Sequence, residues 1–228
     1  MCGRYVLATS ASDLTLILRA ESELDISPNW NVTPSQSVPI VRAEARGRRV
    51  LSRATWGIEA SWSDRGLVIN ARSESVDDKR LFAPMLSGGR CAIPMTGYYE
   101  WRRTNGDGRG TKIPFFIRPR SSSQLDHGGF GVALGLVNPN TMRMVVLTRE
   151  APAMIATIHH RMPVFVDEGR LEAWLSESAG PRDIVNPHPV DEDLDWWEVG
   201  RAVNSSKSSG AQLIAPVDDG GLFGSSGC

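Results

Sequence analysis

Hydrophobic and polar positions divide the chain into a short amphipathic start and a longer β-rich body. Residues 12–21 carry the pattern of an amphipathic helix, with Ser12 as its N-cap and Leu14, Ile17 and Leu18 on one face. Beyond this helix, runs rich in Val, Ile, Phe and Tyr replace the helical spacing and are typical of strands. We predict strands at 37–42, 48–56, 66–70, 90–95, 97–103, 112–118, 130–137 and 142–148.

Turn and cap residues separate these runs. Asn105-Gly106-Asp107-Gly108 is a strong turn signal, so we expect strands 97–103 and 112–118 to form a hairpin. Further helices are predicted at 74–82, at 152–157 with Pro152 in the first turn, and at 168–177 with Asp167 as cap.

The order of these elements predicts the fold class. Strands do not alternate regularly with long helices, which disfavours a doubly wound α/β fold. We expect an α+β domain with a curved, barrel-like, mostly antiparallel β core and flanking helices. No boundary is visible within the 228 residues, so residues 1–217 are assigned to one domain and the Gly- and Ser-rich residues 218–228 to a flexible C-terminal tail.

Composition narrows the class of protein. With 41% hydrophobic and 22% charged residues, the chain has an ordinary globular composition. No apolar run approaches the roughly 20 residues of a membrane span, and the N-terminus has no apolar stretch typical of a signal peptide. Three widely spaced cysteines, Cys2, Cys91 and Cys228, do not make a disulfide framework. We expect a cytoplasmic protein with no membrane partner.

The net charge of −1 conceals an uneven distribution. Residues 181–228 hold 3 basic and 8 acidic side chains, which leaves 22 basic against 18 acidic ones in residues 1–180. Arginine outnumbers lysine 22 to 3, and arginine favours bidentate phosphate contact, although a GC-rich genome produces the same bias. The charge pattern permits nucleic-acid binding without requiring it.

Cys2 occupies a position with special chemistry. Removal of Met1 would give an N-terminal cysteine, with a thiol pKa near 8.5 and an α-amine pKa near 7.7–8.0. Such a 1,2-aminothiol reacts with an aldehyde, first as an imine and then by thiol closure to a five-membered thiazolidine. The alternative is that Cys2 is simply a small apolar residue.

An acidic residue stands among aromatics in Gly97-Tyr98-Tyr99-Glu100-Trp101. Desolvation by such neighbours raises a carboxyl pKa, so Glu100 is a candidate general acid or base near neutral pH. Trp101 is a candidate to stack on a nucleic-acid base. The alternative is a solvent-facing Glu on an edge strand with the aromatics packed inside.

Two histidines adjoin an arginine in Ile158-His159-His160-Arg161-Met162-Pro163. An imidazole beside a guanidinium suits proton transfer next to a phosphate. Adjacent side chains of an extended segment point in opposite directions, so at most one of the histidines is expected to be catalytic. No zinc-ligand spacing occurs, and we predict no metal.

A polar step, Asn70-Ala71-Arg72, ends an apolar run. Alternation places Asn70 and Arg72 on the same face of a strand. The following Ser73 is alternatively a simple helix cap, which explains the Ser but not the Arg.

Together these segments resemble the SOS response-associated peptidase (SRAP) family over roughly residues 1–217. Each motif is weak alone, but the ordered set is specific. The resemblance is carried by Met1-Cys2-Gly3-Arg4-Tyr5, Asn31-Val32-Thr33-Pro34, Trp56-Gly57, Asn70-Ala71-Arg72-Ser73-Glu74, Gly97-Tyr98-Tyr99-Glu100-Trp101, Ile158-His159-His160-Arg161-Met162-Pro163, Val199 to Asn204 and Gln212-Leu213-Ile214.

The resemblance implies a sensor of abasic sites that acts in the DNA-damage and SOS response. Members lose Met1, bind single-stranded DNA and form a stable thiazolidine DNA–protein crosslink through the N-terminal cysteine. The family is also credited with autoproteolytic peptidase activity, which is a hydrolase reaction, and with lyase activity at abasic sites. It implies no cofactor, a monomer, and association with the nucleoid during repair.

The resemblance also implies roles for individual residues, through the motifs to which they belong. Cys2 is the implied nucleophile, Asn70 holds the terminal amine and the sugar, Glu100 shuttles protons, and His159 assists sugar opening or crosslink reversal. The implied DNA-binding residues are Arg4, Arg72 and Arg161 on phosphates, Trp101 as a stacking platform, and Trp62, which stands alone where many members have an aromatic pair after a Pro-containing turn.

Two other functions are compatible with parts of this pattern. Glutamine amidotransferases of the N-terminal nucleophile type also begin Met-Cys-Gly, but their sandwich fold is usually fused to a synthase domain for which 228 residues leave no room. A non-catalytic single-stranded DNA-binding module would use only the arginines and tryptophans. Substitution of Cys2 by Ala would leave simple binding intact and abolish both covalent activities.

Overall fold

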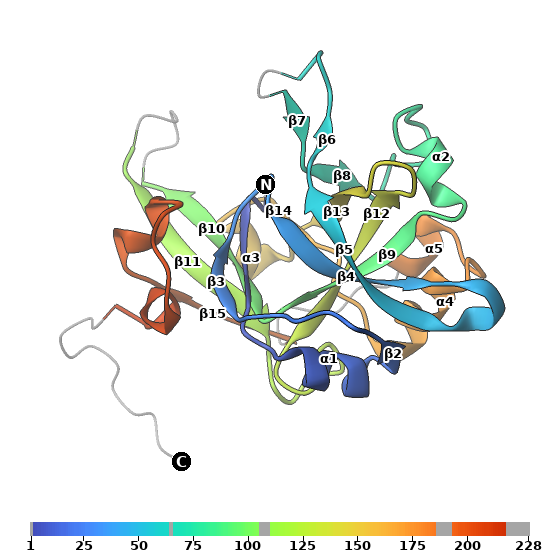
Figure 1. Cartoon of the computed structure of the whole chain (residues 1–228). Coiled ribbons are helices and arrows are strands. Elements are labelled where there is room, and N and C mark those ends of the chain that lie inside the picture. The colour runs from blue at the N-terminus through green and yellow to red at the C-terminus, as the bar shows by residue number, and fades with distance from the viewer. Residues whose placement is uncertain (1, 64–65, 105–109, 186–192, 218–228) are drawn as a thin grey trace.

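The computed structural model describes residues 2–63, 66–104, 110–185 and 193–217 (Figure 1). Two sheets and a projecting hairpin, with a few short helices around them, form an α+β fold in which most strand pairs are antiparallel. The expected fold class is therefore confirmed.

The larger sheet contains a closed barrel. Its strands follow the order β14 (Arg161–Pro163), β13 (Arg143–Glu150), β12 (Gly131–Asn138), β9 (Arg90–Met95), β4 (Ser37–Ala43), β5 (Arg49–Trp56) and β2 (Ala20–Glu21), and β8 (Asn70–Arg72) pairs with β13. A parallel pairing between β13 and β5 closes the ring β13–β12–β9–β4–β5. Closure removes the exposed strand edges that an open sheet would present.

The second sheet has five strands and separates two hydrophobic clusters. Its order is β15 (Leu194–Glu198), β11 (Lys112–Pro119), β10 (Gly97–Arg103), β1 (Arg4–Leu7) and β3 (Asn29–Val32). Tyr5 and Tyr98 face the main core, whereas Val6 and Tyr99 face a smaller cluster. That cluster is completed by Val203 and Leu213, from the 3-10 helices η3 (Arg201–Asn204) and η4 (Ala211–Ile214).

Gly97 begins β10 for a steric reason. A Cβ atom at this position would lie 2.4 Å from Cζ of Phe116 and 2.6 Å from the carbonyl oxygen of Ile117 on the neighbouring strand. Only glycine allows the two backbones to approach this closely. The close approach fixes the start of the strand that carries Glu100.

The remaining helices of the described chain are short, and some of them pack on strands inside the larger sheet. They are α1 (Ala11–Ile17), η1 (Ala45–Gly47), α2 (Ala83–Leu86), α3 (Ala153–Ala156), α4 (Glu168–Leu175) and α5 (Pro181–Val185). The indole of Trp174 in α4 donates to the carbonyl oxygen of Cys91 at 3.0 Å, which attaches this helix to the barrel. Among the described residues, no helix is long and apolar enough to cross a membrane.

Most of the predicted strands are confirmed within a few residues. The hairpin of 97–103 with 112–118 is confirmed as β10 and β11, while its predicted turn at 105–108 falls outside the described residues. The helix capped by Asp167 is confirmed, because the carboxylate of Asp167 accepts from the backbone N–H of Arg170 at 2.8 Å. Residues 218–228 also lie outside the described part of the chain.

Other boundaries are corrected. The first helix is capped by Ser10 rather than Ser12 and ends at Ile17, just before Arg19 turns the backbone to a positive φ of 50°. The helix predicted at 74–82 is wrong: that stretch forms turns, and α2 begins at Ala83. The strand predicted at 66–70 is divided between β7 (Leu67–Val68), which pairs with β6 (Ile58–Glu59), and β8.

Candidate active site and groove

The candidate site lies where the two sheets meet. Arg4 of β1 pairs with Tyr99 of β10, and the same antiparallel register carried one residue further places Gly3 opposite Glu100. On the barrel side, β13 pairs with both β8 and β14. This arrangement brings Asn70 and the loop that precedes β14 to the start of the chain.

Cys2 is buried behind this meeting point. Its side chain has no exposed surface, and its thiol lies 3.8 Å from the carbonyl oxygen of Arg4. Burial raises the pKa of the thiol, and the nearby Glu100 carboxylate raises it further. The amide of Asn70 donates to the carbonyl oxygen of Cys2 at 2.8 Å and fixes the backbone here.

Glu100 is the buried acid of the site. Only 5% of its surface is exposed, and burial raises the pKa of its carboxyl group above the usual range. The edge-strand alternative, with Glu100 in solvent, is excluded because β10 lies inside its sheet and directs this side chain inward. A buried carboxyl group of raised pKa is suited to exchange protons near neutral pH.

His159 faces Glu100 from the other sheet. Its Nε2 lies 3.9 Å from Oε1 of Glu100, and its Nδ1 accepts from the backbone N–H of Arg161 at 3.0 Å. Nδ1 also lies 3.2 Å from the carbonyl oxygen of Arg161, so the backbone of Arg161 holds the ring in either tautomer, with Nε2 toward Glu100. Burial lowers the pKa of His159 to about 4. His160 is exposed, but its ring stacks on that of His159 with 4.4 Å between the centroids. The expectation that the two side chains point in opposite directions is therefore wrong, because His160 lies in a bend and not in an extended strand.

Arg161 makes its contacts inside the protein. It is buried, and its guanidinium donates to the carboxylate of Glu74 at 2.7 and 2.8 Å and to the carbonyl oxygen of Thr148 at 2.6 Å. In this structure the guanidinium of Arg161 is thus engaged within the protein, and its assignment to a DNA phosphate stays a prediction. The backbone of Arg161 also holds the ring of His159.

Arg4 and Trp101 are tied to the C-terminal segment. The guanidinium of Arg4 donates to Asn31 at 2.9 Å and to the carbonyl oxygens of Val203 and Asn204, and it lies 6.0 Å from the ring centroid of Trp101. The indole of Trp101 donates to the side chain of Asn204 at 2.7 Å. These contacts orient both side chains at one side of the site.

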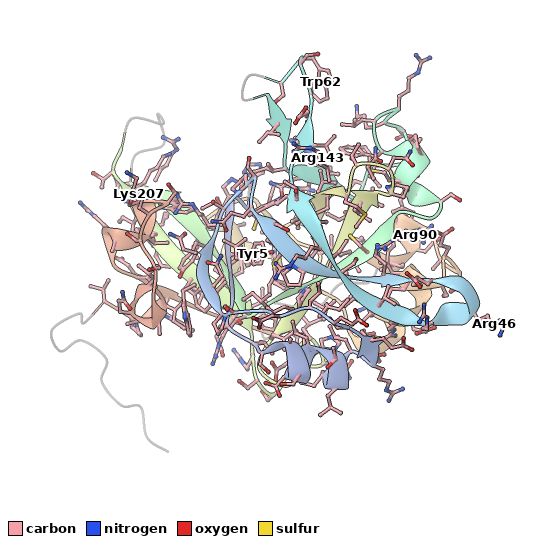
Figure 2. The ribbon with its side chains drawn as sticks, in the orientation of Figure 1. Tyr5, Arg46, Trp62, Arg90, Arg143 and Lys207 are labelled. Atoms are coloured by element: carbon pink, nitrogen blue, oxygen red, sulfur yellow. The ribbon has the colours of Figure 1, made fainter. Side chains whose placement is uncertain are left out.

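An open groove of about 890 Å³ runs over these residues. Among the described residues, its lining comprises Gly3, Arg4, Pro34, Trp62, Ser63, Leu67, Val68, Ile69, Asn70, Glu100, Trp101, Arg103, Lys112, His159 and Asn204. Trp62 is 71% exposed at the outer end of the β6–β7 hairpin, whereas Tyr5 lies inside (Figure 2). Arg72 is exposed on β8 but is not part of the lining.

No group of three or more His, Cys, Asp or Glu side chains among the described residues is arranged to hold a metal ion. The polar side chains of the groove thus offer acid–base chemistry, an amide and cationic contacts rather than a ligand set.

Comparison with protein families matches residues 1–206 to the family described as SOS response associated peptidase (SRAP). The chain belongs to the SRAP family. Its match to the relative named abasic site processing protein YoqW, from Bacillus subtilis (strain 168), has 28% identity over 226 residues and covers 94% of this chain and 99% of the relative. The match to abasic site processing protein YedK, from Escherichia coli (strain K12), has 26% identity and covers 95% of this chain and all of the relative.

The SRAP fold is also found among solved structures. A crystal structure of a protein from Bacteroides thetaiotaomicron aligns with a TM-score of 0.73 at 19% identity, covering 95% of this chain and 100% of that one. At this identity the likeness establishes the fold alone.

Sequence reasoning assigned no individual role to several residues that line the groove or hold its side chains in place. Arg103 and Lys112 line it, Asn204 and Asn31 orient Arg4 and Trp101, and Glu74 holds Arg161. The spacing of Trp101 and Arg103, two residues apart on a strand, could have indicated that both share a face. The other contacts join distant parts of the chain, and no local pattern signals them.

Proposed function

We propose that this SRAP protein, after removal of Met1, captures abasic sites in single-stranded DNA through a covalent bond to Cys2. The observation that carries the proposal is the convergence of Asn70, Glu100 and His159 on the start of the chain, beneath an open groove with aromatic and basic walls. The names of the two bacterial relatives, abasic site processing proteins, support the same substrate.

The first bond forms through nitrogen. Burial keeps the thiol of Cys2 protonated, so the freed α-amine is the better nucleophile and attacks the aldehyde carbon C1′ of the open-chain deoxyribose. Glu100, with His159 beside it, supplies the proton that the leaving hydroxyl of the carbinolamine requires. Water leaves, and the product is a protonated imine that keeps the N–H of the former amine.

The second bond forms through sulfur. The thiol adds to the protonated imine: sulfur bonds to C1′, its proton passes to the Glu100 carboxylate, and the C=N π electrons become a lone pair on nitrogen, which keeps its own proton. The product is a five-membered thiazolidine ring, and the whole sequence releases one water molecule with no oxidation or reduction. Glu100 ends in its starting protonation state, as a proton shuttle must.

Asn70 positions both reactants. Its amide nitrogen holds the carbonyl oxygen of Cys2, and its buried Oδ1 has no hydrogen-bond partner among the described residues. A buried acceptor of this kind favours a donor from outside the protein. We assign it to the Cys2 amine or to a hydroxyl group of the sugar.

The proposed DNA contacts lie along the groove. Trp62 and Trp101 offer ring faces to bases, Arg4 lies at the floor, and Arg72 is exposed beside the site. The imine also acidifies the C2′ hydrogen, so β-elimination at the abasic site is a side reaction of the same intermediate. Autoproteolytic release of Met1 is the corresponding peptidase activity.

The amidotransferase alternative requires two sheets sandwiched between helices, which is not the closed barrel observed. An experiment distinguishes covalent capture from the remaining alternative, which is noncovalent binding alone. Protein lacking Met1 is incubated with single-stranded DNA that contains one abasic site, and the mixture is denatured by heat and detergent before electrophoresis. We expect a stable shifted band for the wild type and none for Cys2→Ala, with noncovalent binding retained by both.

A further inference from the structure

We propose that the β10–β11 hairpin carries the DNA backbone, with Arg103 and Lys112 on the phosphates, while the β6–β7 hairpin faces the bases. This inference rests on the proposed function, because it assumes that the groove holds a single strand. It adds two residues that neither the motifs nor the comparisons assign to DNA.

Strand geometry brings the two cations together. Arg103 is the direct cross-strand partner of Lys112 in the antiparallel pairing of β10 with β11. Trp101 and Arg103 are two residues apart on β10 and therefore point to the same face. All three side chains line the groove.

The neighbouring arginine points elsewhere. Arg102 lies on the opposite face of β10, where its guanidinium carbon is 4.8 Å from the ring centroid of Phe115. It is exposed but does not belong to the described groove lining. Two adjacent arginines of one strand thus differ in access to the groove.

The facing wall has the opposite character. Its described lining from the β6–β7 hairpin and the following residues consists of Trp62, Ser63, Leu67, Val68 and Ile69, without a charged side chain. The two hairpins rise on either side of the chain start in Figure 1. Apolar and aromatic side chains favour base faces, and cations favour phosphates, so the walls orient the strand.

Two other arginines near the site make contacts within the protein. Arg161 is held by Glu74 and Thr148, and Arg4 donates to Asn31, Val203 and Asn204. Glu100 is the only carboxylate in the described lining. The three residues along β10 from Glu100 to Arg103 span about 10 Å, so the two cations lie beside the candidate site.

The test measures equilibrium binding of undamaged single-stranded DNA to Cys2→Ala protein, in which no crosslink forms, over a series of salt concentrations. We expect Arg103→Ala and Lys112→Ala each to reduce the slope of log K against log[salt] by about 0.7, the value for one phosphate contact on a single strand. Arg102→Ala is the matched control and should leave the slope unchanged. Arg103→Lys should restore most of it.

Equal slopes for Arg102→Ala and Arg103→Ala would overturn the inference. An unchanged slope for both Arg103→Ala and Lys112→Ala would also overturn it. Adduct formation by wild-type protein lacking Met1, measured separately with abasic DNA, tests the proposed function. An adduct together with equal slopes rejects only the basic wall. No adduct together with a reduced slope for Arg103→Ala rejects only covalent capture.

Discussion

Nε2 of His159 lies 3.9 Å from Oε1 of Glu100, and the two residues reach this point from different sheets. Glu100 is on β10 of the five-stranded sheet, and His159 precedes β14 of the barrel sheet. The pair exists only when the two sheets are docked. An imidazole whose Nε2 faces a carboxyl group of raised pKa is placed to pass one proton in either direction.

Glu100→Gln should slow adduct formation far more than it weakens DNA binding. Glutamine keeps the shape of the side chain but cannot accept a proton, and a positioned acid or base contributes about 10²–10⁴-fold to a rate. Rates of adduct appearance with abasic DNA and equilibrium binding to undamaged DNA are compared in the same buffer. Glu23→Gln, at an exposed position, is the control. Equal losses of rate and binding for Glu100→Gln would count against proton transfer by Glu100.

His159 should make folding sensitive to acid. Its pKa is about 4 in the folded protein, below its ordinary value of 6.5, so the unfolded chain binds the proton more tightly. The stability that follows is present above pH 6.5 and is lost as the pH falls toward 4. The slope is at most about 1.4 kcal/mol per pH unit, and less here because the side chain is partly exposed.

Urea unfolding at several pH values checks this dependence. His159→Gln should flatten the fall in stability between pH 6.5 and 4 that the wild type shows. Identical pH profiles for wild type and His159→Gln would show that His159 titrates normally.

Glu74→Gln should destabilise the protein because it leaves the buried guanidinium of Arg161 without its carboxylate. Removing one partner of a fully buried ion pair costs on the order of 3 kcal/mol, and the cost here is expected to be smaller because the Glu74 side chain is 45% exposed. Glu59→Gln is the matched control, since Glu59 pairs with Arg143 at the surface and such pairs contribute about 0–1 kcal/mol. Equal free energies of unfolding for the two variants would contradict the structural role given to Arg161.

Tyr98→Phe and Tyr99→Phe should have different effects on stability. The hydroxyl of Tyr98 is buried with no hydrogen-bond partner among the described residues, so its removal is expected to be neutral or stabilising by up to about 1 kcal/mol. The hydroxyl of Tyr99 donates to the carbonyl oxygen of Trp30 at 2.9 Å, and its loss should cost about 0.5–1.5 kcal/mol. A similar cost for both, measured by thermal or urea unfolding, would mean that Tyr98 has a partner in solution, such as an ordered water.

Long strands of the fold were predictable, and short ones were not. β4, β5 and β9 to β13 contain six to eight residues, enough to show β-type composition and turn signals at both ends. β1, β3 and β14 have three or four residues, too few for an alternating pattern. The parallel pairing of β5 with β13 joins residues such as Thr55 and Arg143, whose contact no local pattern can indicate.

For the candidate site, the chemical character of single side chains was a better guide to which residues come together than the residues beside them in sequence. Asn70, Glu100 and His159 converge near Cys2 because each stands at a strand end or on an inward face that alternation defines. The contact of Arg161 with Glu74 was not predictable, because Glu74 is distant in sequence and reaches it only through the pairing of β13 with β8 and β14.

Intact mass measurement of the denatured protein after incubation with abasic single-stranded DNA tests the central claim most directly. We predict one new species, whose mass equals the chain without Met1 plus the oligonucleotide minus one water. Cys2→Ser, which keeps the terminal amine but loses the thiol, should form only a reversible imine and return to its free mass. An unchanged mass for wild-type protein from which Met1 is demonstrably absent would contradict covalent capture through Cys2.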